Sequence, residues 1–491
     1  MKHLKKIMSL ILTAIMVIAM CVPVMAAGET CKITAPATAH RYEIYQIFTG
    51  DLNNRVLSNV KWGENGTGNK GEAVAADILD KLSGVNNKSD REILDVVEQY
   101  AKLKNPVGTV TNGSTYNATP GYYLIKDEDN SVSSTDAYTT YIVQVVGDVN
   151  IQAKSSVPSF EKKLKDKNDT TGETSGWQDS ADYDIGDEIP FKLEGTVASK
   201  YADYKHYYFA FHDKEEKGLS FNESSVKAYI GKDEIPKNYY TIVTPGSEQT
   251  DKCTFEIIFN DLKEIEIIKG VKAVKAGTKI RVEYTSTLND KAVLGNQGNV
   301  NSAKLEFSNN PNSDQTGKPD NTGETPWDNV IVFTYKVVVN KYANSVSEDN
   351  RLTGAEFTLE KKIKGENGAE DTWTPISHVE TGKTSTFTFK GLDDGDYRLT
   401  ETVTPSEFNT ISPIEFTVNA EHTINWNTGE RTDLLTDLTG NVITGNITFT
   451  ADTNKEQLST DVINKSGSTL PETGGIGTTI FYVVGVVLML G

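Results

Sequence analysis

The sequence predicts a mainly β protein in which tandem β-sandwich domains follow a mixed α/β N-terminal domain. Two patterns support this. From Ser155 onward, alternating Tyr, Phe, Val and Thr runs are separated by Gly, Asn and Asp turns, as in sandwich strands. Helical spacing of apolar residues is found between residues 73 and 103. The length of 491 residues allows two to four domains.

The composition narrows the class of protein. Hydrophobic residues make up 37% and charged residues 24%, which excludes wholesale disorder. The net charge of −19 argues against nucleic acid and anionic lipid as partners. Three cysteines are too few for a disulfide-stapled scaffold. We expect Cys31 and Cys253 to fall in different domains and not to pair.

Residues 1–27 read as a secretory signal peptide. Lys2, Lys5 and Lys6 precede an apolar run over 7–20, and small residues at 24–27 offer a cleavage site. An uncleaved anchor is the alternative, but the run is short for a spanning helix. A lipoprotein site at Cys21 is disfavoured by the bulky Met20 before it. We therefore expect a secreted chain.

The body divides into three predicted domains. Residues 28–153 combine the helical region with strand-like runs over 121–126 and 137–146. Residues 154–311 form a middle β domain. A polar, Gly/Pro-rich stretch makes 312–329 a predicted linker, and 330–465 form a third domain. Residues 466–491 hold the C-terminal motif described below.

Alternation in the third domain places charged residues on apolar strand faces. Lys341 is the last residue on a strand face that also carries Phe333, Tyr335, Val337 and Val339. Glu401 shares a face with Tyr397 and Leu399, and Asn464 shares one with Val462. Burying an unpaired Lys or Glu is costly. One explanation is a buried salt bridge, or a strand end at which Lys341 reaches solvent. The other is an intramolecular amide bond.

In that reaction a neutral lysine amine attacks the Asn side-chain carbonyl and ammonia leaves. An apolar site favours the neutral amine by depressing its pKa, and burial also favours a protonated acid. The acid can polarise the carbonyl and shuttle the proton. Fixed proximity contributes further, since effective molarities reach about 10⁵ M or more.

The middle domain has a similar set of residues. Lys162 shares a face with Phe160 and Leu164, and Asp213 follows Tyr207, Phe209 and Phe211 on another. A third face carries both Asn301 and Asn309, with Ala303, Leu305 and Phe307 between them. Strand parity does not choose between these two asparagines.

The C-terminus carries Leu470, Pro471, Glu472, Thr473 and Gly474, followed by an uncharged segment. With a signal peptide, this LPXTG pattern resembles the sorting signal of Gram-positive surface proteins. The resemblance implies that a sortase cleaves after Thr473 and holds its carbonyl as a thioester. Such signals end in a basic tail, which is missing here. Either the sequence is clipped or membrane retention is weakened.

Four further segments resemble a Cna-B-type domain, as in the last domain of sortase-assembled backbone pilins: 339–341, 352–359, 397–405 and 462–465. That resemblance implies an immunoglobulin-like sandwich with a Lys341–Asn464 isopeptide and Glu401 as catalyst. The family usually continues Pro-x-Gly-Tyr where this chain has Pro405-Ser-Glu-Phe.

The middle domain resembles the Cna-A type, which implies a bond from Lys162 catalysed by Asp213. Asn301 is preferred to Asn309 because Asn-Ser-Ala resembles the family's Asn-x-Ala pattern. Residues 42–50 resemble the opening strand of the pilin family, but the first domain shows no clear Lys/acid/Asn set.

The resemblance implies a major shaft subunit of a pilus on the cell wall of a Gram-positive bacterium. The implied partners are a pilin-type sortase, further copies of the chain, ancillary pilins, peptidoglycan through a housekeeping sortase, and a host or matrix ligand. Backbone pilins need an exposed lysine before the middle domain. Spacing favours Lys154, although the family's Tyr-Pro before the lysine is missing, and Lys163 and Lys165 are alternatives.

The rival readings are a singly displayed wall-anchored adhesin and a pilus base or tip subunit. A glycan-active enzyme is more remote. We expect no enzyme, because the amide-forming chemistry is self-modification without turnover. The sequence has no nucleophile elbow, phosphate loop or zinc-protease motif, and we expect no cofactor. His206 and His212 lack a third metal ligand. The acidic loop with Asp166, Asp169, Asp179 and Asp182 lacks EF-hand spacing, so we expect solvated surface there.

Overall fold

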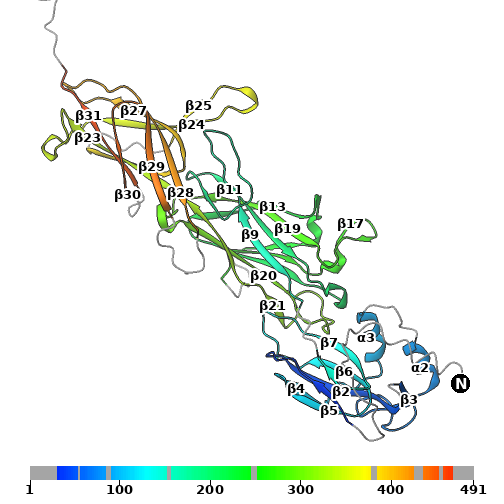
Figure 1. Ribbon diagram of the computed structural model, residues 1–491. Coiled ribbons are helices and arrows are strands. Elements are labelled where there is room, and N and C mark those ends of the chain that lie inside the picture. Colours follow the sequence, from blue (N-terminus) through cyan, green and yellow to red (C-terminus); the bar gives the residue numbers. More distant parts are fainter. Residues whose placement is uncertain are drawn as a thin grey trace, which may run out of the picture.

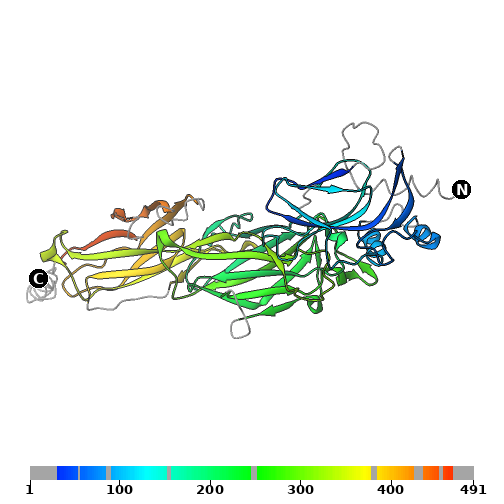
Figure 2. The same cartoon turned by 90° about the horizontal axis from the view of Figure 1, so that it is seen from below.

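The computed structural model describes residues 30–53, 56–83, 90–151, 156–244, 252–376, 384–424, 435–452 and 457–467. The signal segment, Lys154 and the motif at 470–474 lie outside these ranges. Three domains follow one another along an elongated molecule, with the first and third at opposite ends (Figures 1 and 2). Across the described residues, no helix is long and apolar enough to span a membrane.

The first domain combines two sheets with two helices. One sheet has the order β5-β1-β8; the other has the order β3-β2-β6-β7, with β4 also paired to β2. The predicted helical region holds both helices, and buried Leu82, Leu94 and Val97 pack against the second sheet, in one cluster with Trp62 of β3. The elements are β1 (Cys31–Thr34), β2 (Arg41–Asn53), β3 (Val56–Trp62), α2 (Ala76–Ser83), α3 (Asp90–Glu98), β4 (Gly108–Thr111), β5 (Thr115–Ala118), β6 (Gly121–Asp127), β7 (Thr140–Val145) and β8 (Val149–Asn150).

The middle domain is a sandwich of two large sheets. Their orders are β10-β22-β20-β12-β16-β15, with β21 beside β20, and β14-β13-β19-β11-β9; β17 and β18 form a separate hairpin. The strands are β9 (Ser159–Leu164), β10 (Ser180–Asp182), β11 (Glu188–Thr196), β12 (Phe209–Glu215), β13 (Leu219–Ile230), β14 (Asp233–Glu234), β15 (Thr241–Val243), β16 (Phe255–Phe259), β17 (Glu266–Ile268), β18 (Val271–Lys272), β19 (Lys279–Leu288), β20 (Asn299–Ser308), β21 (Thr322–Glu324) and β22 (Asp328–Phe333).

The structure differs from the predicted linker over 312–329. Strands β21 and β22 both pair with β20, so the middle sandwich continues to Phe333. The Gly- and Pro-rich composition marks a loop within the domain rather than its end. Val330 and Val332 are buried in the middle core, whereas Ile331 and Phe333 are buried in the third core. Alternation along β22 therefore joins the two domains through one strand that is buried on both faces.

The third domain is a second sandwich, with sheets β26-β23-β31-β30 and β25-β24-β27-β28-β29. Its first and last strands, β23 and β31, pair in parallel. The strands are β23 (Tyr335–Ala343), β24 (Glu356–Ile363), β25 (Thr372–Pro375), β26 (Thr386–Leu392), β27 (Gly395–Val403), β28 (Ile414–His422), β29 (Leu435–Thr444), β30 (Phe449–Asp452) and β31 (Gln457–Asn464). The predicted fold class, tandem β-sandwiches after a mixed α/β domain, is confirmed.

Two smaller predictions have different outcomes. Cys31 and Cys253 are buried in different domains and no disulfide joins them, as expected. The expectation of solvated surface in the acidic loop is wrong for Asp182, which is buried. It lies on β10, which pairs in parallel with β22 at the domain junction, and periodicity in a strand of three residues cannot show this.

Candidate functional site

Lys341, Glu401 and Asn464 meet inside the third domain. The Lys341 Nζ contacts Asn464 Oδ1 and lies 3.2 Å from Glu401 Oε1. The Asn464 Nδ2 donates to both Glu401 oxygens, at 2.9 and 3.0 Å. Lys341 and Asn464 have no exposed surface and Glu401 is 5% exposed. The amine, the amide and the acid thus form one closed buried cluster.

The strand register explains this meeting. Lys341 pairs with Val462 across the parallel β23–β31 ladder. Asn464 lies two residues beyond Val462, so it points to the same face. Glu401 reaches the pair from β27 in the opposite sheet. Burial lowers the pKa of Lys341 and the charge of Glu401 opposes this. A lowered pKa favours the neutral, nucleophilic amine.

The middle domain also brings a lysine, an acid and an asparagine into one buried cluster. The Lys162 Nζ donates to Asp213 Oδ2 at 2.5 Å and to the Tyr284 hydroxyl at 2.7 Å. The Tyr284 hydroxyl donates to Asp213 Oδ2 at 2.6 Å and accepts from Asn301 Nδ2 at 2.9 Å. Tyr284 therefore bridges the amine and the amide, with its one donor and two acceptor positions all used.

The surroundings of Lys162 are apolar. Its Nζ lies 5.2 Å from the ring centre of Phe191 and 5.3 Å from that of Tyr284. Burial lowers the pKa of Lys162, against the pull of Asp213, and burial raises the pKa of Asp213. The lowered pKa of Lys162 favours the neutral amine that amide formation requires, and the raised pKa of Asp213 makes its carboxylate a stronger proton acceptor.

Asn301 and Asn309 lie in different places. Asn301 belongs to the Lys162 cluster. Asn309 lies at the junction with the first domain, where its Nδ2 donates to the Asp136 carbonyl at 3.3 Å and its own carbonyl accepts from Tyr138 N at 2.7 Å. Both are buried, as parity predicts, because the strand face continues past the sandwich core into the junction.

Sequence reasoning missed two members of this cluster, Tyr284 and Glu215. Tyr284 alternates inward with Ile280, Val282, Ser286 and Leu288 on β19, so parity could have placed it. Glu215 lies two residues after Asp213 and therefore on the same face. Its Oε1 accepts from Asn301 Nδ2 at 3.3 Å.

The alternative polymerisation lysines make their own contacts. Lys163 pairs with Asp179 at 2.5 Å, and Lys165 Nζ lies 4.8 Å from the ring centre of Trp177.

The two histidines that share a strand face contact different acids. His206 Nδ1 lies 2.6 Å from Asp261, and His212 Nε2 lies 3.0 Å from Glu306.

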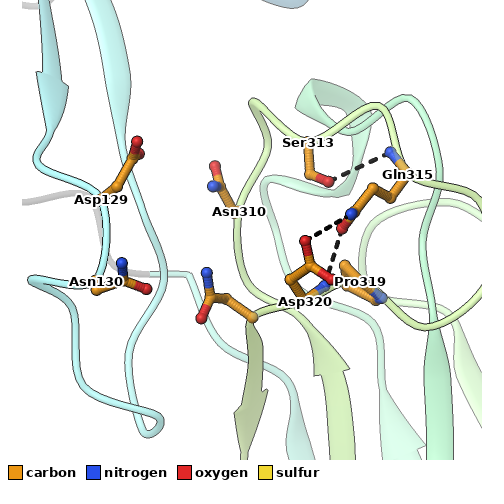
Figure 3. A pocket seen from close by; sticks show the side chains of 8 residues that line it. Asp129, Asn130, Asn310, Ser313, Gln315, Pro319 and Asp320 are labelled. Atoms are coloured by element: carbon orange, nitrogen blue, oxygen red, sulfur yellow. Dashed lines mark hydrogen bonds between the residues drawn. The ribbon is translucent and has the colours of Figure 1, made fainter.

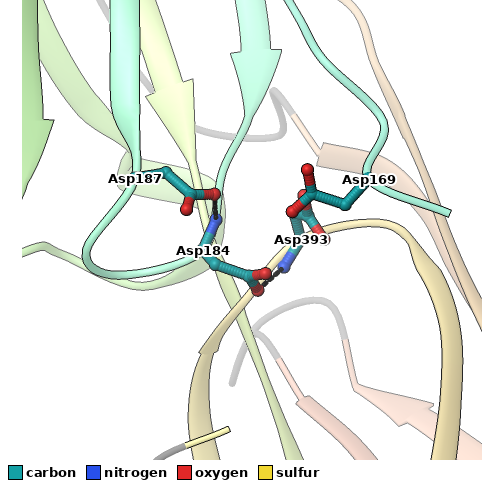
Figure 4. A group of neighbouring side chains, drawn as sticks. All are labelled: Asp169, Asp184, Asp187 and Asp393. Carbon is teal, nitrogen blue, oxygen red and sulfur yellow. Dashed lines mark hydrogen bonds between the residues drawn. The ribbon is translucent and has the colours of Figure 1, made fainter. Parts of the chain in front are cut away.

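Another buried lysine, Lys361, lies at the junction of the middle and third domains. Carboxylate oxygens of Asp169, Asp184, Asp187 and Asp393 lie within 4.8 Å of one another there (Figure 4). The Lys361 Nζ donates to Asp184 at 2.7 Å and to Asp169 at 3.3 Å, and also contacts Asp393. Burial lowers the pKa of Lys361, but the aspartates outweigh this and raise it. This lysine is a fixed cation that ties the two domains.

The junction of the first and middle domains holds a polar pocket of about 330 Å³. Asp129 and Asn130 line one side, and residues of the loop after β20 line the other (Figure 3). Gln315 and Asp320 on the loop side are joined by two hydrogen bonds, of 2.8 and 2.9 Å. The lining side chains are mostly amides and carboxylates, with the Ser313 hydroxyl and Pro319 among them.

The chain is similar to known proteins in sequence and in fold. A family model described as the SpaA prealbumin-like fold domain matches residues 312–432. The chain is 25% identical over 437 residues to the trypsin-resistant surface T6 protein of Streptococcus pyogenes serotype M6. The match covers 78% of this chain and 75% of that protein.

Two solved structures share the fold over most of the chain. The T6 backbone pilin of serotype M6 Streptococcus pyogenes, described as a modular three-domain structure, aligns with a TM-score of 0.52 and 18% identity, covering 91% of this chain and all of that one. The full-length major pilin SpaD from Corynebacterium diphtheriae aligns with a TM-score of 0.50 and 16% identity, covering 90% and 99%. Through the matched domain, the sequence relative and the shared fold, this chain is similar to the backbone pilins of Gram-positive bacteria.

Proposed function

We propose that this chain is the shaft subunit of a covalently polymerised, wall-anchored pilus, locked internally by Lys162–Asn301 and Lys341–Asn464 amide bonds. The observation that carries the proposal is the repeated buried cluster of a lysine, a carboxyl group and an asparagine, one in each sandwich. A purely structural salt bridge needs no asparagine amide beside it.

In the third domain the contacts support the following reaction. Glu401 takes a proton from the Lys341 amine, which attacks Asn464 Cγ. The bond between Cγ and Nδ2 then breaks, and Glu401 returns the proton to the departing nitrogen, which leaves as ammonia. Glu401 touches both nitrogens, so it can serve as base and then as acid. The chain modifies itself once, without turnover.

The mechanical role depends on which strands the bonds join. A Lys341–Asn464 bond ties the first strand of the third domain to its last, and a Lys162–Asn301 bond ties the first strand of the middle domain, β9, to β20 in the opposite sheet. Load entering at one end of a sandwich then passes through covalent bonds, and the strands between them carry little force.

Polymerisation uses the C-terminal motif and an exposed lysine. A pilin-type sortase joins the Thr473 carbonyl of one copy to the Lys154 amine of the next, and a housekeeping sortase attaches the finished fibre to peptidoglycan. Ancillary pilins and a host or matrix ligand are further partners. The relative's name, a surface protein, fits this location.

Two measurements test the proposal. The measured mass of the unfolded, secreted chain should be lower than the mass calculated from its sequence by two ammonia molecules. In Lys162→Ala and in Lys341→Ala the difference should shrink to one ammonia molecule. Incubation with a pilin-type sortase should give a ladder of polymers that Lys154→Ala abolishes and that Lys163→Ala and Lys165→Ala leave intact. A full mass would exclude the internal bonds, and the absence of a ladder would favour a singly displayed adhesin.

A further inference from the structure

We propose that Glu215 is a second catalytic residue of the middle domain, and that it supplies the proton gained by the Asn301 nitrogen as that nitrogen leaves. The inference rests on the proposed function, because it presumes that a Lys162–Asn301 bond forms. In the third domain one carboxyl group accepts the proton of the amine and gives a proton to the leaving nitrogen. In the middle domain these two tasks would fall to two carboxyl groups.

The comparison of the two clusters carries the argument. In the third domain, Glu401 touches both the Lys341 amine and the Asn464 amide nitrogen. In the middle domain, Asp213 contacts the Lys162 amine at 2.5 Å, while the carboxyl group in contact with Asn301 Nδ2 is that of Glu215, at 3.3 Å. Among the described residues, no hydrogen bond joins Asp213 to Asn301. Asp213 alone therefore does not reach the leaving group.

The strand register fixes Glu215 in this position. Asp213 faces Ala303 across the antiparallel β12–β20 ladder, and Glu215 faces Asn301 directly. Directly opposed side chains lie on the same side of a sheet. The Ser286 hydroxyl on β19 also donates to Glu215 Oε1, which orients the carboxyl group toward the amide. Its Oε2 atom is buried.

The protonation state of Glu215 suits a proton donor. Burial, followed by the neighbouring Asp213 charge, raises the pKa of Glu215 to about 8. At neutral pH the group therefore holds its proton, and a general acid works best when its pKa lies near the working pH. Asp213 contacts the Lys162 amine and is suited to the opposite task of accepting a proton.

The step balances as follows. The neutral Lys162 amine attacks Asn301 Cγ, and a bond forms between Nζ and Cγ. The amine nitrogen gives one proton to the Asp213 carboxylate. The bond between Cγ and Nδ2 breaks, and Nδ2 takes one proton from the Glu215 carboxyl group and leaves as ammonia. Asp213 ends protonated, Glu215 ends ionised, and the charge of the cluster is unchanged.

Glu215→Gln tests this assignment in the full chain. Glutamine keeps the shape and an acceptor for Asn301 and Ser286, but it has no acidic proton. Chains translated in vitro, held unfolded in urea and diluted into folding buffer are quenched at intervals and mapped for both cross-links. General acid catalysis contributes about 10²-fold or more, so the Lys162–Asn301 bond should form at least that much more slowly. The Lys341–Asn464 bond in the same chain is the internal reference. Glu216→Gln is the matched control, since Glu216 accepts from Val300 N and lies one residue away.

The pH profile separates catalysis from a structural role. In the wild-type chain the rate of middle-domain bond formation should fall as the pH rises through about 8, and the variant should lose that fall. A variant that bonds at the wild-type rate would overturn the role of Glu215 and leave the proposed function standing. If the variant does not fold, a flat wild-type profile would overturn the role in the same way. A wild-type chain that never forms the middle-domain bond would overturn the proposed function itself.

Discussion

Lys341 and Asn464 touch inside the third sandwich although 123 residues separate them in the sequence. They lie on β23 and β31, which run in parallel as the first and last strands of the domain. A bond between them closes almost the whole domain into one covalent loop. Parallel terminal strands are loaded in shear when the chain is pulled, and the bond lies directly across that sheared pair.

Lys341→Ala should destabilise the third domain, and its measured mass should no longer lack the ammonia that this cross-link releases. Closing a loop of about 100 residues is worth about 4 to 5 kcal/mol through the entropy of the unfolded chain. The variant should therefore melt about 10 °C or more below the wild type by calorimetry. Lys336→Ala, on the outward face of the same strand, is the matched control. Equal melting of Lys341→Ala and the control would contradict the cross-link.

Most of the fold and part of the middle site could be predicted from alternation along strands. Period-two patterns place Lys162, Asp213, Lys341 and Glu401 on buried faces, and the structure has them there. Parity shows which face a residue occupies but not how far along the sandwich it lies. For that reason Asn301 and Asn309 were equivalent by pattern, yet only one lies in the Lys162 cluster.

The junctions were beyond the sequence patterns for a different reason. Strand β22 is buried on one face by the middle domain and on the other by the third domain. The segment before it is polar and Gly-rich, a composition that is typical of a linker. Lys361 lies on β24, on the same inward face as Phe357 and Leu359, and two of the aspartates it contacts, Asp169 and Asp184, belong to the middle domain. Alternation along one strand can show that such a residue faces inward, but it cannot show that its partners come from a second domain.

Tyr284→Phe should slow bond formation in the middle domain and leave the third domain unaffected. The substitution keeps the ring that packs on Phe191, at a centroid distance of 5.3 Å, and removes the hydroxyl that joins Lys162, Asp213 and Asn301. Without the bridge, the amine and amide are no longer aligned, and small misplacements of reacting groups cost about 10²-fold in rate. Time-resolved mapping of the two cross-links measures this. Tyr229→Phe, on the neighbouring strand β13, is the control; equal rates for both variants would rule out a role for the bridge.

Lys361→Met should loosen the junction between the middle and third domains. The positive charge of Lys361 offsets the negative charges of aspartates that belong to both domains and contact it. Removing one partner of a buried ion pair costs about 3 to 5 kcal/mol, since the remaining charges are left unpaired. Hydrogen exchange at β10 and β22 should increase in the variant. Lys362→Met serves as the control, because Lys362 is only partly buried and its ion pairs are longer, at 3.6 and 3.8 Å. Unchanged exchange in Lys361→Met would mean that β22 alone holds the junction.

His40 should make the junction of the first and middle domains sensitive to pH. Its two ring nitrogens lie 2.8 Å from Asp127 and 2.9 Å from Asp136, and the ring is buried. Burial lowers the pKa of His40, but the hydrogen bonds and charges of Asp136 and Asp127 outweigh it and raise the pKa. Asp136 belongs to the loop that docks on the middle domain through Tyr138 N and Asn309 O, 2.7 Å apart.

The sign of the effect follows from the raised pKa. The folded chain holds the His40 proton more tightly than the unfolded chain, so this stabilisation is complete below about pH 6.5, the ordinary value for histidine, and is lost as the pH rises through the raised value. Each pKa unit corresponds to about 1.4 kcal/mol. Exchange of the 128–139 loop should therefore rise with pH in the wild type beyond the intrinsic rate, and His40→Asn should remove that dependence. His206→Asn should keep it, because His206 pairs with Asp261 away from this loop. A pH dependence that survives in His40→Asn would assign the effect to another group.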